Sequence, residues 1–274
     1  MPRITWTSTQ YFLRACIWIC LVLYILYLYK SGSIVYYIAP RMLIFVKIAV
    51  IGLFILAVFQ TDIAIRSLKR QEISCGCEAV PSRSIGKNVA IYGLFVLPLL
   101  LGFFLPNTAM SSSLAAKKGV NVGGTNVTFH ANQFNQDFAK LGIKLYQQDT
   151  IELGDELYLE KLQTLDSFVD NFLGKEIRLT GFVYRDPELG QNQLIVGRFA
   201  ITCCTADAST YGVIVESSEA SQLPEDTWVT VTGTIERAKH KGTDVWKVMG
   251  THVEKINAPS NPYVYPNYDF GSQL

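Results

Sequence analysis

The stretch MLIFVKIAVIGLFILAVF, residues 42–59, decides the fold class of this chain, because Lys47 is its only charged residue. An α-helix needs about 20 predominantly apolar residues to cross the hydrocarbon core of a bilayer. Two other runs have the same character: FLRACIWICLVLYILYLY at residues 12–29 and VAIYGLFVLPLLLGFFL at residues 89–105. Three such runs leave too little polar surface for a water-soluble helical fold. The sequence therefore predicts a membrane-embedded region of three transmembrane helices, residues 1–106.

Charge is divided unevenly along the chain. Residues 1–128 contain 12 Lys and Arg but only 3 Asp and Glu, whereas residues 129–274 contain 12 Lys and Arg and 20 Asp and Glu. A basic half could bind nucleic acid, but here the basic residues flank long apolar runs, as they do in membrane proteins. We therefore expect the lipid bilayer, and no nucleic acid, as a partner of the N-terminal half.

The loops between the apolar runs predict the orientation of the helices. Five Lys and Arg lie between the second and third runs, against two between the first and second. Because Lys and Arg are enriched in cytoplasmic loops, the loop between the second and third runs should be cytoplasmic. We expect a multi-pass plasma-membrane protein with a cytoplasmic N-terminus and an extracytoplasmic segment after Leu105.

Two charged residues, Arg14 and Lys47, lie inside the apolar runs. Charges within a membrane are commonly functional. Both residues also lie within about two turns of a helix end, so snorkelling to the interface explains them equally well. Three helices with so few polar groups make a poor transport path by themselves. They indicate an anchor, or a subunit that packs against a larger membrane protein.

The second half of the chain has a different pattern. Residues 107–128, rich in Ser, Ala, Gly and Lys, predict a flexible linker. LEKLQTLDSFVDNFLG, residues 159–174, spaces its apolar residues mostly three and four apart, which predicts an amphipathic helix that ends at Gly174. The apolar period then becomes two, and five strands are expected, at residues 176–184, 193–203, 211–217, 228–236 and 245–256.

Five short strands with internal glycines are typical of a small Greek-key barrel of the OB type. The predicted fold class is therefore a helical membrane region followed by a small all-β OB-like barrel with a preceding helix, which occupies an extracytoplasmic domain at residues 129–274. A five-stranded open sheet and an SH3-like barrel are the alternatives. The acidic composition of this domain is unlike that of the OB barrels that bind oligonucleotides.

Adjacent cysteines, Cys203 and Cys204, follow the second predicted strand in the stretch FAITCCTADAS. A disulfide between neighbouring residues is strained, because their Cα atoms lie about 3.8 Å apart. If the strand continues through both, one side chain enters the core and the other faces out. Three interpretations stay open: small packed side chains, a soft-metal site completed by Asp207 or a histidine such as His252, and redox or partner-linked thiols.

A second pair, Cys75 and Cys77, lies in the predicted cytoplasmic loop. Thiols stay reduced in the cytoplasm, and two thiolates hold a soft metal such as zinc only when other ligands complete the site. No histidine lies nearby, since all three histidines follow residue 128. Two reduced cysteines on a turn and a transient or partner-shared metal site are the alternatives, so no cofactor is predicted with a complete set of ligands.

Several of these stretches together resemble one family. Three N-terminal helices, LLLGFFLP before the linker, GKEIRLTGFVYRD at residues 174–186 and RFAITCCTADA at residues 198–208 are similar to the YcgQ-like, or DUF1980, family of bacterial membrane proteins. The resemblance covers essentially the whole chain, and the last two stretches are its most specific parts. It implies a subunit of a two-component permease complex, with a polytopic permease as partner and no enzymatic activity.

Two functions are therefore expected. The first is an accessory subunit of a bacterial plasma-membrane permease, which acts in transport by association with the permease. The second is a membrane-tethered, extracytoplasmic metal- or redox-binding protein that uses Cys203 and Cys204. An enzyme is not expected, because the sequence shows no Ser/His/Asp set, glycine-rich phosphate loop or HExxH motif.

Overall fold

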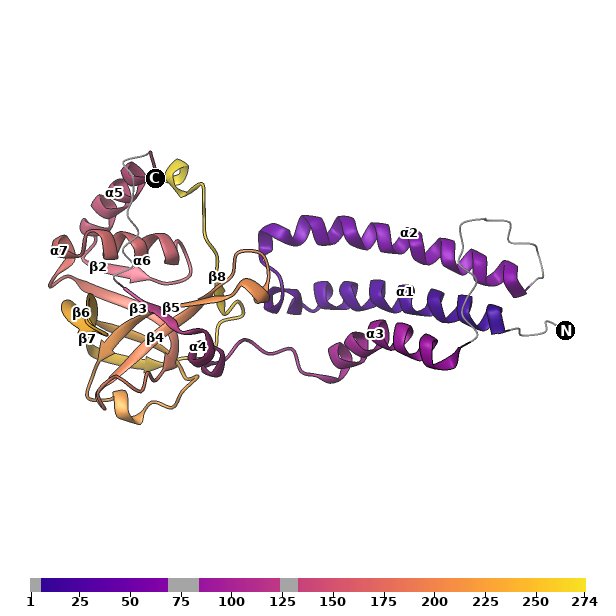
Figure 1. Cartoon of the computed structure of the whole chain (residues 1–274). Coiled ribbons are helices and arrows are strands. Elements are labelled where there is room, and N and C mark those ends of the chain that lie inside the picture. The colour runs from indigo at the N-terminus through magenta and orange to yellow at the C-terminus, as the bar shows by residue number, and fades with distance from the viewer. Residues whose placement is uncertain (1–5, 69–83, 124–132) are drawn as a thin grey trace. The chain divides into compact units, whose positions relative to one another are not determined.

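The computed structural model describes residues 6–68, 84–123 and 133–274 of the chain. The chain divides into two compact units, Met1–Thr108 and Ala109–Leu274. The first unit is helical, and the second combines a sheet with short helices (Figure 1). Each unit is described by itself.

The first unit is built from three long helices, α1 (Trp6–Lys30), α2 (Leu43–Leu68) and α3 (Ile85–Phe104). The short 3-10 helices η1 (Ser33–Tyr36) and η2 (Pro40–Met42) connect α1 to α2. All three long helices contain spans that are long and apolar enough to cross a membrane: Ser8–Lys30, Pro40–Leu68 and Gly86–Phe104. The prediction of three such helices is confirmed.

Helix α2 is longer than the predicted run, which stops at Phe59. It continues to Leu68 through a polar last part, where Asp62 Oδ2 lies 2.7 Å from Arg66 Nε. This pair has the i,i+4 spacing that brings side chains together on one helix face. The apolar pattern predicted the membrane span but not the helical extension beyond it.

The helices contact one another through a few small or aromatic side chains. Tyr11 and Ala15 of α1 pack against Ile63 and Ala64 of α2. Helix α3 contacts α1 where the ring of Phe103 lies 5.0 Å from that of Tyr24. Most apolar side chains of the three helices remain exposed, which a protein in water does not tolerate on this scale.

The second unit begins with α4 (Ser112–Lys118), β1 (Val120–Val122), α5 (Gln133–Tyr146) and β2 (Thr150–Leu153). Helices α6 (Tyr158–Ser167) and α7 (Val169–Phe172) follow. The remaining strands are β3 (Glu176–Tyr184), β4 (Gln193–Ala200), β5 (Ser209–Glu216), β6 (Trp228–His240), β7 (Thr243–Lys255) and β8 (Tyr263–Val264). Three 3-10 helices lie between or after them: η3 (Thr205–Asp207), η4 (Ala220–Gln222) and η5 (Phe270–Gln273).

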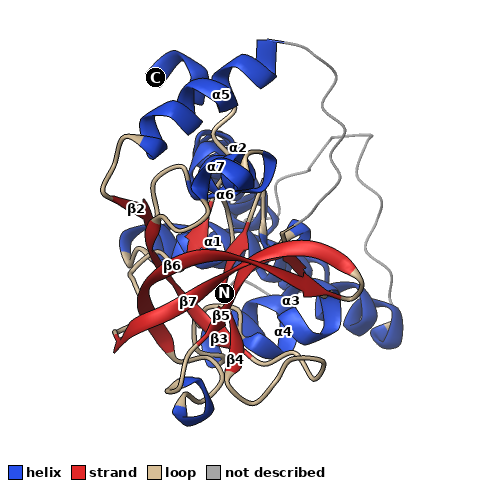
Figure 2. Cartoon of the chain, turned by 90° about the vertical axis from the view of Figure 1, so that its left-hand side faces the viewer, coloured by secondary structure: helices blue, strands red, loops and turns tan. Residues whose placement is uncertain are grey.

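The eight strands form one mixed sheet in the order β1-β5-β7-β6-β3-β4-β8, with β2 paired to β3. Strands β3, β4, β5, β7 and β6 also form a closed circuit of pairings, because β4 pairs with β5 as well as with β3. All pairings in this circuit are antiparallel except β5 with β7. Strands β6 and β7 form the long curved hairpin seen in Figure 2.

Strands β1, β2 and β8 were not predicted. Each has two to four residues, too few for a period-two pattern to be recognised, and each pairs in parallel with a strand far away in the sequence. The second predicted strand is also too long, since β4 ends at Ala200. Both cysteines therefore lie outside the strand.

The predicted linker, residues 107–128, is not uniformly irregular where it is described. Residues 112–118 form α4, and residues 120–122 form β1, which pairs with β5. The predicted amphipathic helix is interrupted at Phe168, which separates α6 from α7. Its predicted end at Gly174 is confirmed, because Gly174 has a φ of +78°, the left-handed conformation that glycine adopts without strain.

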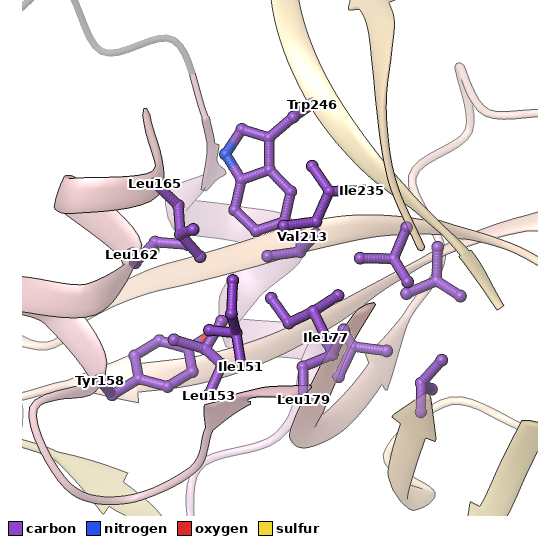
Figure 3. Close-up of a cluster of buried hydrophobic side chains, with 14 of the residues drawn as sticks. Ile151, Leu153, Tyr158, Leu162, Leu165, Ile177, Leu179, Val213, Ile235 and Trp246 are labelled. Atoms are coloured by element: carbon purple, nitrogen blue, oxygen red, sulfur yellow. The ribbon is translucent and has the colours of Figure 1, made fainter. Parts of the chain in front are cut away.

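The core of this unit lies between α6 and the inner face of the sheet (Figure 3). Leu162 and Leu165 of α6 face Ile151 of β2 and Ile177 of β3. These four side chains are 4% exposed or less. Burial of each contributes about 1.5–3 kcal/mol. The helix predicted before the strands is thus an integral part of the same core.

Candidate functional site

The turn that follows β4 brings together three of the predicted site residues, Cys203, Cys204 and Asp207. The two sulfur atoms lie 3.9 Å apart, both thiols are free, and both side chains are half-buried. The Asp207 carboxylate folds back on the turn: Oδ1 accepts the N–H of Thr202 at 3.0 Å, and Oδ2 accepts the N–H of Cys203 at 2.7 Å. The condition under which one cysteine would enter the core is not met, because β4 ends at Ala200, before either residue.

A lysine from α4 holds the other side of this turn. Lys118 Nζ donates to the carbonyl oxygens of Ala206, at 3.2 Å, and Ala208, at 2.8 Å. Lys118 lies in the segment predicted to be a flexible linker, so its role was not expected from the sequence. The turn is therefore fixed both by its own carboxylate and by a distant cation.

The electrostatics of the turn keep Cys203 protonated. Its hydrogen bond to the Asp207 carboxylate, with a smaller contribution from the Cys204 thiol, raises the pKa of Cys203 to about 11. Partial burial acts to raise the pKa of Asp207, but the hydrogen bonds from the Cys203 thiol and from backbone N–H groups outweigh it, so this pKa lies below its usual value. Because the thiolate is the reactive form of cysteine, Cys203 is a poor nucleophile at neutral pH.

The turn offers two sulfur ligands for a metal ion but no complete set of ligands among the described residues. Both Asp207 oxygens already accept hydrogen bonds from the turn. His252 lies on β7 and lines a separate surface cavity with Glu176, Arg178 and Glu254. Within residues 6–68, 84–123 and 133–274, no group of three or more His, Cys, Asp and Glu side chains is arranged to hold a metal ion. Cys75 and Cys77 lie outside the described residues.

The two charges of the apolar runs have aromatic partners. Arg14 Nε donates to the Tyr92 hydroxyl of α3 at 3.0 Å, and Lys47 Nζ lies 5.4 Å from the centre of the Tyr29 ring. Arg14 therefore joins α1 to α3, and Lys47 joins the start of α2 to the end of α1. Both contacts stabilise the helical unit.

Arg198 of β4 is a residue that the sequence reasoning missed. Its side chain is completely buried, and it shares the inner face of β4 with Leu194, Val196 and Ala200. Its guanidinium lies 5.1 Å from the Trp228 ring and 5.9 Å from the Tyr158 ring. The one signal in the sequence was a charge in place of an apolar residue in the alternation of QLIVGRFA. A buried charge of this kind is costly unless it is paired.

Comparison with known proteins connects these features to one family along most of the chain. Residues 13–121 match the model of the DUF1980 N-terminal domain, and residues 128–266 match that of the DUF1980 C-terminal domain. The second match begins near the start of the sheet unit and includes Arg198, both adjacent cysteines and Asp207.

Two relatives are similar over most of their own length. The UPF0703 protein YcgQ of Bacillus subtilis strain 168 is 28% identical over 196 residues, which are 65% of this chain and 69% of that protein. A protein of Streptococcus mutans (strain ATCC 700610 / UA159) is 24% identical over 266 residues, 88% of this chain and 94% of that protein. The latter has the provisional name of two-component membrane permease complex subunit.

Proposed function

The chain belongs to the DUF1980 family, and from this premise we propose that it is an accessory subunit of a two-component permease complex in a bacterial plasma membrane. It would act in transport by association with a polytopic permease. The observation that carries this proposal is the Streptococcus mutans relative, which has that provisional name and aligns with this chain over 94% of its own length. The proposal includes no enzymatic step.

The helical unit supports association rather than independent transport. Large apolar side chains point outward from all three helices, including Leu23 of α1, Phe54 of α2 and Leu94 of α3, each more than half exposed. Lipid or a larger membrane protein can cover such faces. A small residue that permits close helix packing, Gly102, already serves the contact of α3 with Tyr24 of α1.

The proposed orientation places the N-terminus in the cytoplasm and the sheet unit outside the cell. It is supported by the excess of Lys and Arg between α2 and α3 over that between α1 and α2. In this orientation the sheet unit is available to present substrate to the permease or to gate it from the outer face.

We also propose that the sheet unit has an OB-type barrel at its centre. The closed circuit of β3, β4, β5, β7 and β6 supports this assignment, as does the single parallel pairing in it, between β5 and β7. Such barrels commonly hold ligands on a strand face or between their loops. The extra strands β1, β2 and β8 extend the sheet beyond the circuit.

Co-purification tests the subunit proposal directly. The tagged full-length chain is extracted from its native membranes in a mild detergent, and proteins that accompany it are identified and quantified by mass spectrometry. We expect one polytopic permease in near-stoichiometric amount. A tagged three-helix membrane protein from an unrelated family is the control for non-specific capture. Absence of any enriched permease, under conditions that preserve other membrane complexes, would contradict the proposal.

The second candidate is a soft-metal-binding protein tethered to the membrane. It is favoured by one observation, the 3.9 Å separation of two partly exposed sulfur atoms, since two thiolates on one tetrahedral metal lie at a similar distance. Zinc titration of the full-length chain, compared with the Cys203→Ser/Cys204→Ser variant, tests it. Saturable zinc binding that the double variant loses without unfolding would support this candidate, and equal binding by both proteins would remove it.

A further inference from the structure

The buried guanidinium of Arg198 lacks hydrogen-bond acceptors among the described residues. The side chain is 0% exposed, yet its Nε and both terminal nitrogens have no hydrogen-bond acceptor among the residues that the structure describes. A guanidinium has five N–H donors, and it is never deprotonated in proteins. Leaving these donors without acceptors in a buried site costs free energy, so the site is suited to an acceptor that the described chain does not supply.

One anion pairs with Arg198 in the described sheet unit, the carboxylate of Asp155, and its side chain is mostly exposed. Asp155 Oδ1 lies 2.7 Å from Arg198 Nη1, but the pair lacks the alignment of a hydrogen bond. The side chain of Asp155 is 67% exposed, so it reaches the buried guanidinium from the surface. Nε and the second terminal nitrogen are free of this pair. They form the edge that an arginine offers to both oxygens of a carboxylate or phosphate.

The turn that bears Asp155 shows a second, independent feature. Leu157, two residues further on, has a φ of +51°, in the left-handed region that non-glycine residues seldom adopt. Such strained positions cluster at ligand sites, where the surrounding structure maintains them. The strain here lies between Asp155 and Tyr158, the two residues that contact the guanidinium from this side.

Two aromatic rings pack against the guanidinium of Arg198. Trp228 and Tyr158 face the guanidinium and provide cation–π attraction without accepting its edge hydrogen bonds. Burial raises the pKa of the Tyr265 hydroxyl and the nearby Arg198 charge acts to lower it, but that hydroxyl donates to Asn261 Oδ1 at 3.0 Å and accepts no hydrogen bond from the guanidinium. An apolar, aromatic wall with one buried cation is suited to a small organic acid or a phosphate.

We propose that Arg198 is an oxyanion-binding residue of the sheet unit, at which a carboxylate or phosphate group displaces Asp155 and pairs with the guanidinium. Asp155 acts as a resident counter-ion that keeps the site closed when no ligand is bound. This proposal goes beyond the permease assignment and does not depend on it, because it concerns only what the sheet unit binds.

Anion titration of the full-length protein in detergent tests this site. Inorganic phosphate and sodium acetate are the probes, added at constant ionic strength against chloride, and two signals are followed: the thermal unfolding midpoint and tryptophan fluorescence, since Trp228 lies against the guanidinium. In Asp155→Ala the site has lost its counter-ion, so a probe should produce a saturable change in fluorescence and should raise the unfolding midpoint by about 5–10 °C at a concentration of about 100 Kd. The wild type should need a higher concentration of the same probe.

The matched control is Asp170→Ala. Asp170 pairs with Arg237, and both side chains are at least half exposed, so water already solvates the cation that this variant leaves behind. We expect no saturable response there beyond that of the wild type. Asp155→Asn, which keeps the size of the side chain, replaces Asp155→Ala if the latter fails to fold.

The outcomes separate the alternatives. A response to acetate but not phosphate identifies a carboxylate ligand, and the reverse identifies a phosphate ligand. The response should disappear in the double variant Asp155→Ala/Arg198→Met. If Asp155→Ala and Asp155→Asn show no more anion response than Asp170→Ala, Arg198 is a structural cation and the proposal is wrong. Co-purification of a permease would be unaffected by either result.

Discussion

The two units of this protein treat the same apolar side chains in opposite ways. In the sheet unit, Leu179 of β3 is 0% exposed and lies in a core closed by α6, whereas Leu94 of α3 is 73% exposed. The sheet unit therefore satisfies its hydrophobic surface internally. The helical unit forms its backbone hydrogen bonds internally, but its apolar side chains need lipid or another protein to cover them. Only the sheet unit therefore buries its apolar side chains without lipid or another protein.

The strongest test of this comparison is the same substitution in both units. Leu179→Ala should lower the free energy of unfolding of the sheet unit by about 2–5 kcal/mol, because it opens a cavity in a closed core. Leu94→Ala should change the free energy of unfolding of the helical unit by less than about 0.5 kcal/mol. Guanidinium unfolding of the full-length protein in detergent, followed by tryptophan fluorescence, measures both. Similar losses in the two variants would mean that the units do not differ in this way.

A second prediction concerns the packing inside the helical unit. A Cβ atom at Gly102 would overlap the ring of Tyr24, so Gly102→Leu should cost about 1–3 kcal/mol of helix packing and separate α3 from α1. Spin labels at positions 26 and 100, in a background without native cysteines, would report a longer and broader distance. The control is Gly93→Leu on the same helix, where nothing lies within 4 Å of the added Cβ. An unchanged distance in Gly102→Leu would contradict the described packing.

A third prediction uses the Cys203 turn. Since the hydrogen bond to Asp207 raises the pKa of Cys203 to about 11, the thiolate is scarce at pH 8. Asp207→Asn should lower this pKa and speed alkylation of Cys203 about tenfold, less than the rise in thiolate because a less basic thiolate is also less nucleophilic. Iodoacetamide labelling, with mass spectrometry that resolves Cys203 from Cys204, measures the rate. Asp244→Asn, at an exposed carboxylate of the β6–β7 hairpin, should leave it unchanged.

The smallest predicted effect is a pH dependence of the sheet unit. Glu160 of α6 is buried, and its Oε1 accepts the N–H of Asn267 at 2.7 Å. Burial, opposed in part by this hydrogen bond, raises its pKa in the folded state. The unfolded state therefore loses this proton at a lower pH, and stability falls as pH rises through the unfolded and then the folded pKa.

Glu160→Gln should remove that fall. At pH 4 its unfolding midpoint should be equal to or lower than that of the wild type, and the difference should change in favour of the variant as pH rises to 7. Glu156→Gln, at an exposed position two residues before α6 begins, provides the control and should follow the wild-type profile. Parallel profiles for Glu160→Gln and the wild type would show that the Glu160 carboxyl has the same pKa in both states.

The part of the fold that was predictable is the part set by local patterns. Continuous apolar runs predicted α1, α2 and α3, and period-two alternation predicted β3, β4, β5, β6 and β7 within a few residues of their bounds. Both patterns repeat several times within one element, so an error at one residue does not hide them. The helix end at Gly174 was predictable for a different reason, because glycine adopts the required φ more readily than other residues.

The candidate site was predictable only in its residue types. FAITCCTADAS placed two thiols and a carboxylate within five residues, and the structure brings all three into one turn. Their geometry depends on where β4 stops, and that boundary is set by the pairing of Ala200 with Ser209 and with Val264. The protonated state of Cys203 follows from that geometry and not from its neighbours in the sequence.

Local sequence patterns were enough to predict a helical unit suited to a membrane and a strand-rich unit with an opposite charge balance, because hydrophobic periodicity and charge are local properties. Tertiary structure alone decided the closed circuit of strands, the attachment of Lys118 to a turn some 90 residues away, and the burial of Arg198 beneath Asp155. These contacts join segments that are distant along the chain, and no local pattern records which of them meet.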